Sequence, residues 1–276
     1  MENVAELLTV TKMLTGLSES KLADYLGVAR STLSRLQHGK TKPSDDLLEK
    51  LYSFAYENPF HSFSVNDLKM EFFLDLHKGL LFHGTRSLLD APLDLDHSRT
   101  NVDLGRGFYL GETYQQAASY VAMTKKARVY VFKTKTFGVE LEWMLAVAYY
   151  RGELERFKDH PLMRAIVDEC EKADVIIAPI ADNNMYELMN RFARGYITDL
   201  AATRALSASN LGLQHIFRTQ KALDSLEMID ECFLCSAEKK DLFVSREKKA
   251  QTSMDKAKIS LEKYRREGKY VEELFK

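Results

Sequence analysis

Cysteine is scarce in this chain, with three among 276 residues, and the formal net charge is only −1. Small secreted proteins stapled by disulfides hold many more cysteines, so the sequence predicts a chain that works in a reducing cytoplasm. No apolar run approaches the roughly 18 residues that a membrane span needs. The first residues, MENVAELL, have no basic segment ahead of an apolar one, so we expect no signal peptide.

Metal ligands are equally sparse. Cys232 and Cys235 form one C-x-x-C pair, without the second pair or nearby His residues that a zinc site usually takes. We therefore expect ordinary strand cysteines and no metal. A composition of 45% hydrophobic and 29% charged residues over this length is typical of a globular chain with about two domains.

Residues 1–60 carry the signals of several short helices. Ser18 predicts the start of a helix over SESKLADYL, and Gly27 predicts its end. A second helical segment, VARSTLSRLQHG, follows at once, and DDLLEKLYSFAY comes after Pro43. The block LADYLGVARSTLSRLQHGKTKPS resembles the helix-turn-helix of the lambda-repressor and Cro type, so we expect a DNA-binding domain over residues 1–60.

The expected DNA contacts follow from that resemblance and from a local strip of positive charge without an acid. They are Arg30, Ser31, Thr32, Arg35, Lys40 and Lys42. Two features argue against tight binding: the segment as a whole has seven Lys/Arg against eight Asp/Glu, and Glu19 stands where the family commonly has Gln. A bundle that only docks a partner remains the alternative.

Residues 61–79 are expected to be a linker, because Pro59 and a Ser/Asn cluster change the character of the chain. The apolar residues Val65, Leu68, Phe72 and Leu76 are compatible with a helix or with a strand, and the period alone leaves both open.

Residues 80–236 contain three motifs in a fixed order: HGT at His83, GRGFY ending at Tyr109, and AASY ending at Tyr120, eleven residues later. Their order and spacing resemble the ADP-ribosyltransferase fold of the diphtheria-toxin and poly(ADP-ribose)-polymerase type. Closer still, DLGRGFYL, APIADNNMYELMNRFARG and LGLQHIFRTQKALDSL resemble a bacterial family of uncharacterised transferase-like domains, often encoded in toxin–antitoxin or phage-defence loci.

The resemblance implies an α+β fold with a split β-sheet, and NAD as co-substrate. It assigns a ribose hydroxyl to His83, and Gly84 and Thr85 complete the triplet that binds the nicotinamide half, with glycine allowing the backbone to approach. Tyr109 and Tyr120 would offer ring faces to the cationic nicotinamide.

The resemblance makes His83 and Tyr109 the first two catalytic positions, and the third falls on Gln214, at the start of the last-but-one strand. Relatives usually have Glu there. Gln keeps a hydrogen bond without the charge, which disfavours polymer elongation and leaves single transfer or NAD hydrolysis open. Asp182 ends the apolar run Val175–Ile180 and is a candidate for orienting substrate, with helix capping as the equal alternative.

The remaining segments read as strands and helices that build a core. ARVYVFKTK is predicted to be a strand, VELEWMLAVAYYRG a buried helix with Trp143 in the core, and DHPLMRAIVDECEKA a helix starting at Pro161. Residues 237–276 form a basic helical tail, with twelve Lys/Arg against eight Asp/Glu. Its apolar seam, which could cover the enzyme domain, form a homodimer or touch nucleic acid, comprises Ala250, Met254, Ala257, Leu261 and Tyr264.

The sequence thus predicts a cytoplasmic mono-ADP-ribosyltransferase that uses NAD to modify an unknown protein or nucleic acid. As a toxin or phage-defence effector it would have an antitoxin as partner and would use its helix-turn-helix for autoregulation. Two alternatives stay open because of Gln214: a transcriptional regulator whose second domain senses NAD or another nucleotide without chemistry, and an NAD glycohydrolase.

Overall fold

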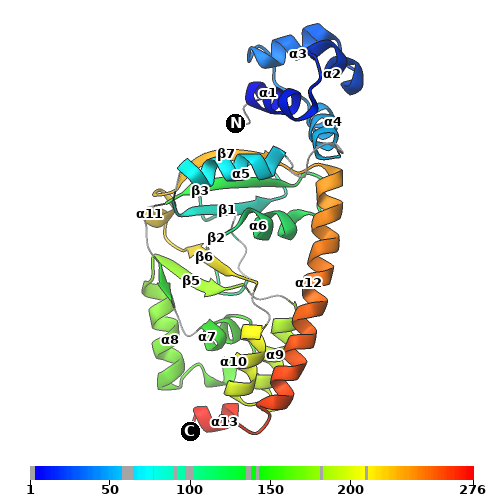
Figure 1. Cartoon of the computed structure of the whole chain (residues 1–276). Coiled ribbons are helices and arrows are strands. Elements are labelled where there is room, and N and C mark those ends of the chain that lie inside the picture. Colours follow the sequence, from blue (N-terminus) through cyan, green and yellow to red (C-terminus); the bar gives the residue numbers. More distant parts are fainter. Residues whose placement is uncertain are drawn as a thin grey trace. The chain divides into compact units, whose positions relative to one another are not determined.

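The computed structural model describes residues 4–57, 65–76, 78–89, 92–96, 98, 102–134, 138–140, 143–180, 183–208 and 211–276. The chain divides into two compact units and passes between them several times. One unit comprises Met1–Leu89, Thr113–Lys133 and Met228–Val244. The other comprises Asp90–Glu112, Thr134–Glu227 and Ser245–Lys276. The class is α+β, as expected, with an N-terminal helical region followed by strands and helices (Figure 1).

The N-terminal helices form a bundle around buried leucines, among them Leu22, Leu26 and Leu33. Ser18 caps the second helix by accepting a hydrogen bond from the Lys21 backbone, and Gly27 ends that helix at φ 66°. Both local predictions are confirmed, because a capping side chain and a left-handed glycine each act within a few residues. The helices are α1 (Val4–Thr15), α2 (Glu19–Leu26), α3 (Arg30–Gln37) and α4 (Asp45–Tyr56).

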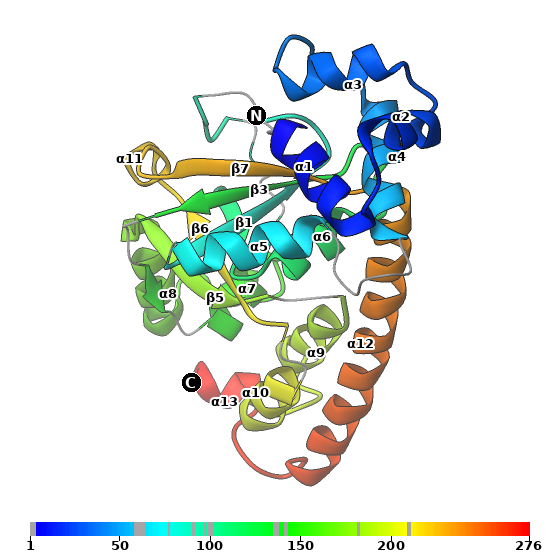
Figure 2. The ribbon, with the colours of Figure 1, turned by 45° about the horizontal axis from the view of Figure 1, so that its top comes forward.

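The same unit contains three strands in the order β1-β3-β7, with β1 antiparallel to β3. The segment whose period was ambiguous is a helix, and its Met70 and Phe73 pack with Phe82 and Val129 of the strands. A second helix, over residues 114–121, packs on the same apolar face through Ala117, Ala118 and Val121. Figure 2 labels the two helices α5 and α6. These elements are α5 (Val65–Leu76), β1 (Leu80–Thr85), α6 (Tyr114–Val121), β3 (Arg128–Lys133) and β7 (Glu227–Phe233).

The end of β7 completes the core of the helical bundle. Phe233 and Cys235 belong to the same buried cluster as the bundle leucines, and the Phe233 ring lies 5.5 Å from the Tyr52 ring, tilted by 51°. Cys232 points into the other cluster, with β1 and β3, because neighbouring strand residues face opposite sides. The two cysteines are therefore packing residues of two different cores.

The second unit has four strands in the order β4-β5-β6-β2. β6 runs antiparallel to β2 and β5, and β4 is parallel to β5. The predicted helix over VELEWMLAVAYYRG is shorter than expected, because Val139 and Glu140 pair with Ile176 and Ile177 instead. The strands are β2 (Phe108–Gly111), β4 (Val139–Glu140), β5 (Val175–Pro179) and β6 (Leu213–Phe217).

Helices pack against these strands and share one core with them, including Leu104, Met163 and Phe192. Pro161 starts its helix as predicted, since the first turn of a helix needs no donor there. The helical elements are α7 (Trp143–Tyr150), η1 (Glu155–Phe157), α8 (Pro161–Lys172), α9 (Asn183–Ala193), α10 (Asp199–Ala208) and α11 (Gln220–Leu223).

The tail consists of the long helix α12 (Ser236–Lys263) and the single turn α13 (Val271–Leu274). Ala257 and Leu261 of the predicted seam pack against the core of the second unit, so the seam covers part of the chain itself. Gly268 adopts φ 89° and passes so close to Asp199 that a Cβ would lie 2.3 Å from its carboxylate. Across the described part of the chain, no helix is long and apolar enough to cross a membrane.

Candidate functional site

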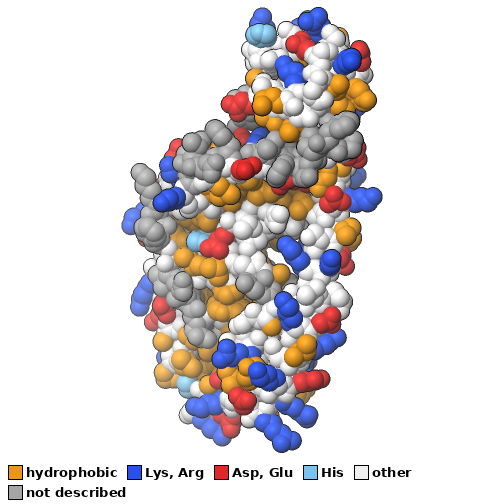
Figure 3. All heavy atoms as spheres, viewed as in Figure 1, with side chains coloured by type: hydrophobic (Ala, Val, Ile, Leu, Met, Phe, Trp, Pro, Cys, Tyr) orange, Lys and Arg blue, Asp and Glu red, His pale blue; other side chains and the backbone are white. Residues whose placement is uncertain are grey.

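Helix α3 presents the predicted DNA contacts on the surface of the bundle. Leu33 and Leu36 are 1% and 3% exposed and fix the helix on its neighbours. Arg30, Ser31 and Arg35 are exposed on the other side of the helix, and Thr32 is half-buried. Figure 3 shows Lys and Arg side chains on this bundle, and the two following lysines, Lys40 and Lys42, are exposed as well.

Glu19 lies close to this surface. Its carboxylate is 3.6 Å from Arg30 Nε, with side-chain exposures of 28% and 71%. An ion pair this exposed contributes little to stability. It does reduce the positive charge that Arg30 offers to a phosphate, because a carboxylate there repels the DNA backbone.

The residues predicted to bind NAD are divided between the two units. In the first, His83-Gly84-Thr85 forms the last three residues of β1. Strand alternation places His83 on the face away from α6, opposite Tyr130 of β3. Tyr120, on α6, is 59% exposed.

Packing against helix α6 requires glycine at position 84. A Cβ at this position would lie 2.3 Å from the carbonyl oxygen of Ala117 and 3.1 Å from Val121. Helix α6 therefore sits directly on the backbone of β1, which fixes the helix that carries Tyr120 relative to His83. A close approach to another backbone is a usual reason for glycine within a strand.

In the second unit, Tyr109 and Gln214 point to the same face of the sheet. Tyr109 lies opposite Ile216, and Gln214 lies opposite Gly111, in the antiparallel register of β2 and β6. The Tyr109 hydroxyl donates to the Gly105 carbonyl at 2.7 Å and accepts from the Leu104 backbone at 3.1 Å. Burial raises the pKa of Tyr109 above its usual value. Its hydroxyl is thus held by the GRGFY loop itself.

Gln214 is 7% exposed and belongs to a buried polar network. Its Nε2 donates to Asp103 Oδ2 and to the Pro179 carbonyl, both at 3.1 Å. Asp103 also accepts from Arg151 Nη2 at 2.8 Å and from the Tyr186 hydroxyl. Burial first, and then this hydrogen bond to Asp103, raise the pKa of Tyr186.

A cavity of about 310 Å³ opens beside the network, lined by Arg151, Tyr186, Glu153, Ala148 and Met189. The guanidinium of Arg151 also stacks over the ring of Tyr186, 4.1 Å from its centroid. The cavity therefore combines a cation, a carboxylate and a phenol with two apolar walls, which suits a polar ligand with an apolar part.

The sequence did not single out Asp103, Arg151 or Tyr186. Asp103 opens the block DLGRGFYL, and Tyr186 lies inside APIADNNMYELMNRFARG, so two of the three stand in the segments that carry the family resemblance. Their place inside these segments was the signal that could have identified Asp103 and Tyr186 as candidates. Asp182, the remaining candidate, lies outside the residues that the structure describes.

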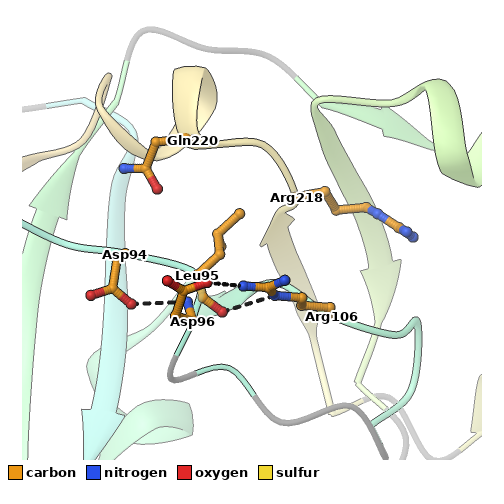
Figure 4. Close-up of a pocket in the computed structure, with 6 residues that line it drawn as sticks. All are labelled: Asp94, Leu95, Asp96, Arg106, Arg218 and Gln220. Carbon is orange, nitrogen blue, oxygen red and sulfur yellow. Dashed lines mark hydrogen bonds and ion pairs between the residues drawn. The ribbon is translucent and has the colours of Figure 1, made fainter.

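Arg106 of the GRGFY segment is engaged close to its own loop, as Figure 4 shows. Its Nη2 lies 2.5 Å from Asp96 Oδ1, and its Nε donates to the Leu95 carbonyl at 3.0 Å. Arg106 and Arg218 both line a second cavity, of about 280 Å³. Arg218 also donates a hydrogen bond to the Leu104 carbonyl. Asp94 and Asp96 also line this cavity, so two guanidinium groups and two carboxylates give it a balanced formal charge.

Comparison with known families assigns most of the chain. Residues 13–52 match the helix-turn-helix family, which covers α2, α3 and most of α4, and identify the bundle as a DNA-binding module of the lambda-repressor and Cro type. Neither the curated proteins nor the solved structures include one with significant similarity to the chain. Residues 80–228 match the family described as protein of unknown function (DUF3990), from β1 into β7. Since this match spans more than half of the sequence, the chain belongs to the DUF3990 family and carries a helix-turn-helix ahead of that domain.

Proposed function

We propose that the DUF3990 domain is a mono-ADP-ribosyltransferase that takes NAD as co-substrate and modifies a macromolecule. The helix-turn-helix would bring this activity to DNA or let the protein regulate its own gene, as an effector of a toxin or phage-defence system. In this proposal His83, Gly84, Thr85 and Tyr120 bind the nicotinamide half of NAD.

The observation that carries the proposal is the element on which each motif falls. HGT ends the first strand, GRGFY leads into the second, and the second tyrosine lies on the helix that follows. Gln214 is the second residue of β6, the last-but-one strand, where the resembling transferases have their third catalytic residue. Four positions in the same order and on matching elements support a common ancestry better than any single motif.

The chemistry fits the side chains available. Loss of nicotinamide from NAD leaves an oxocarbenium-like ribose, so the protein must hold the dinucleotide and stack a cationic ring. The exposed ring of Tyr120 offers a stacking face. His83 offers a ring nitrogen to a ribose hydroxyl.

Incubation with labelled NAD tests the proposal. Purified protein is mixed with cell lysate, and the label is followed into protein, RNA, DNA and free ADP-ribose. Transfer predicts label in one macromolecular fraction and release of nicotinamide, both lost in His83→Ala. A protein that binds NAD but gives neither product is a sensor and not a transferase.

The sensor is the second candidate, and Gln214 favours it. An uncharged amide at the third catalytic position can hold a ribose hydroxyl but cannot offset the cationic charge of the transition state. A regulator whose DNA affinity responds to NAD would need only that binding. Hydrolysis of NAD to free ADP-ribose, without an acceptor, is separated from transfer by the same labelling experiment.

A further inference from the structure

The amide of Gln214 is fixed in one orientation by its two neighbours. Asp103 Oδ2 and the Pro179 carbonyl are both acceptors, so only the NH₂ end of the amide can face them. Both N–H groups are used in these bonds. The remaining hydrogen-bonding atom of the amide is Oε1, which can only accept.

We infer that Asp103 is a positioning residue for Gln214: it fixes the amide so that Oε1 accepts a hydrogen bond from a ligand hydroxyl, and it makes glutamate unsuitable at position 214. The identity of that ligand as NAD, whose ribose carries such hydroxyls, rests on the proposed function. The pairing of Asp103 with Gln214 does not.

The charges of the network explain why the chain has Gln where related transferases usually have Glu. Among the residues that the structure describes, Arg151 is the cationic partner of Asp103, at 2.8 Å. Its other partners, Tyr186 and Gln214, are neutral donors. A glutamate at 214 would bring a second carboxylate within about 3 Å of the first, and buried like charges at that distance repel strongly. It would also turn an acceptor toward the Pro179 carbonyl, which now receives a donor.

The sensitive test is a double-mutant cycle between Asp103 and Gln214, read by melting temperature in the full-length protein. Asp103→Asn alone removes the charge that Arg151 faces and should lower the melting temperature by roughly 4–8 °C. Gln214→Glu alone should lower the melting temperature by more than Asp103→Asn does. The fall should be smaller at pH 5 than at pH 8, because a proton bound at pH 5 removes the second negative charge. Glu187→Gln, an exposed charge change on α9, is the control and should leave it unchanged.

The decisive result is a reversal of sign. In the Gln214→Glu background, Asp103→Asn relieves the repulsion and should raise the melting temperature. Where Gln214→Glu yields no soluble protein, recovery of soluble double variant is the same reversal. If Asp103→Asn lowers the melting temperature equally in both backgrounds, or the double variant is no more soluble, the pairing is refuted.

Calorimetric titration with NAD separates this inference from the proposed function. Native protein and Glu187→Gln should bind NAD equally, and Asp103→Asn should bind at least about fivefold more weakly, since the acceptor is no longer held. Equal affinity of native protein and Asp103→Asn would overturn the positioning role while the proposed function stands. Native protein that does not bind NAD would overturn the proposed function, and the melting cycle would still decide whether Asp103 positions Gln214.

Discussion

Arg128 joins the helical bundle to the strands of the first unit, and its removal should be costly. The side chain is 6% exposed, with Nη2 2.8 Å from Asp45 at the start of α4 and Nε 2.7 Å from Glu231 of β7. The guanidinium also lies 4.4 Å from the centroid of the Phe233 ring. Methionine in its place would keep most of the packing and remove the charge.

The two ion pairs of Arg128 contribute differently to the free energy of unfolding. Asp45 is 58% exposed, so loss of its pair should cost under about 1 kcal/mol. Glu231 is 15% exposed, and a mostly buried carboxylate left without its cation should cost roughly 2–3 kcal/mol. The sum of about 3 kcal/mol corresponds to a fall in melting temperature of roughly 6–12 °C for a unit of this size.

Differential scanning calorimetry of Arg128→Met measures that fall, and hydrogen exchange locates it. Amide exchange should rise in α4 and β7 and stay unchanged in the second unit. Adding Glu231→Gln to Arg128→Met should recover much of the lost stability, because the unpaired charge is gone. Arg128→Met with the stability of the native protein, or a double variant no better than the single, would show that the pair with Glu231 contributes nothing.

Three other variants test other parts of the structure. Arg35→Ala should weaken binding to the gene's own promoter by about 1–3 kcal/mol and relax sequence choice, and a gel shift insensitive to salt would contradict a DNA role. His83→Ala should weaken NAD binding by roughly 1–3 kcal/mol in calorimetry, and an unchanged affinity would remove His83 from the site. Burial raises the pKa of Glu238 from 4.5 to about 7, so the folded protein binds this proton more tightly than the unfolded chain does. The resulting contribution to the free energy of unfolding, about 3 kcal/mol, is complete below pH 4.5 and is lost as the pH rises through 7. Glu238→Gln should flatten that pH dependence of unfolding, and the exposed control Glu247→Gln should not.

Local signals allowed much of the fold to be predicted. Ser18 and Gly27 mark helix ends within a few residues, and the run of β-branched and aromatic residues in β3 predicts a strand from the segment itself. The contacts that fix the functional residues are of a different kind. Asp103 and Gln214 are 111 residues apart, and Arg128 reaches Asp45 across 83 residues. A pattern of apolar and polar residues along one chain carries no information on which distant carboxylate an amide or a guanidinium meets.

The same limit applies to position 214. Motif order located Gln214 at the start of its strand, but it did not indicate which charged group lies beside the amide. Only the position of Asp103 shows that the negative charge is already present beside the amide.

The placement of Phe233 and Cys235 in the bundle core has a consequence for synthesis on the ribosome. The DNA-binding helices emerge first, yet two of the residues that close their core emerge only after the whole stretch 80–228 has been made. A truncated chain would carry recognition helix α3 on an incomplete bundle, with a gap where the ring of Phe233 meets Tyr52. Chains that end before Phe233 would therefore bind the operator weakly and would compete poorly with longer chains for the same DNA.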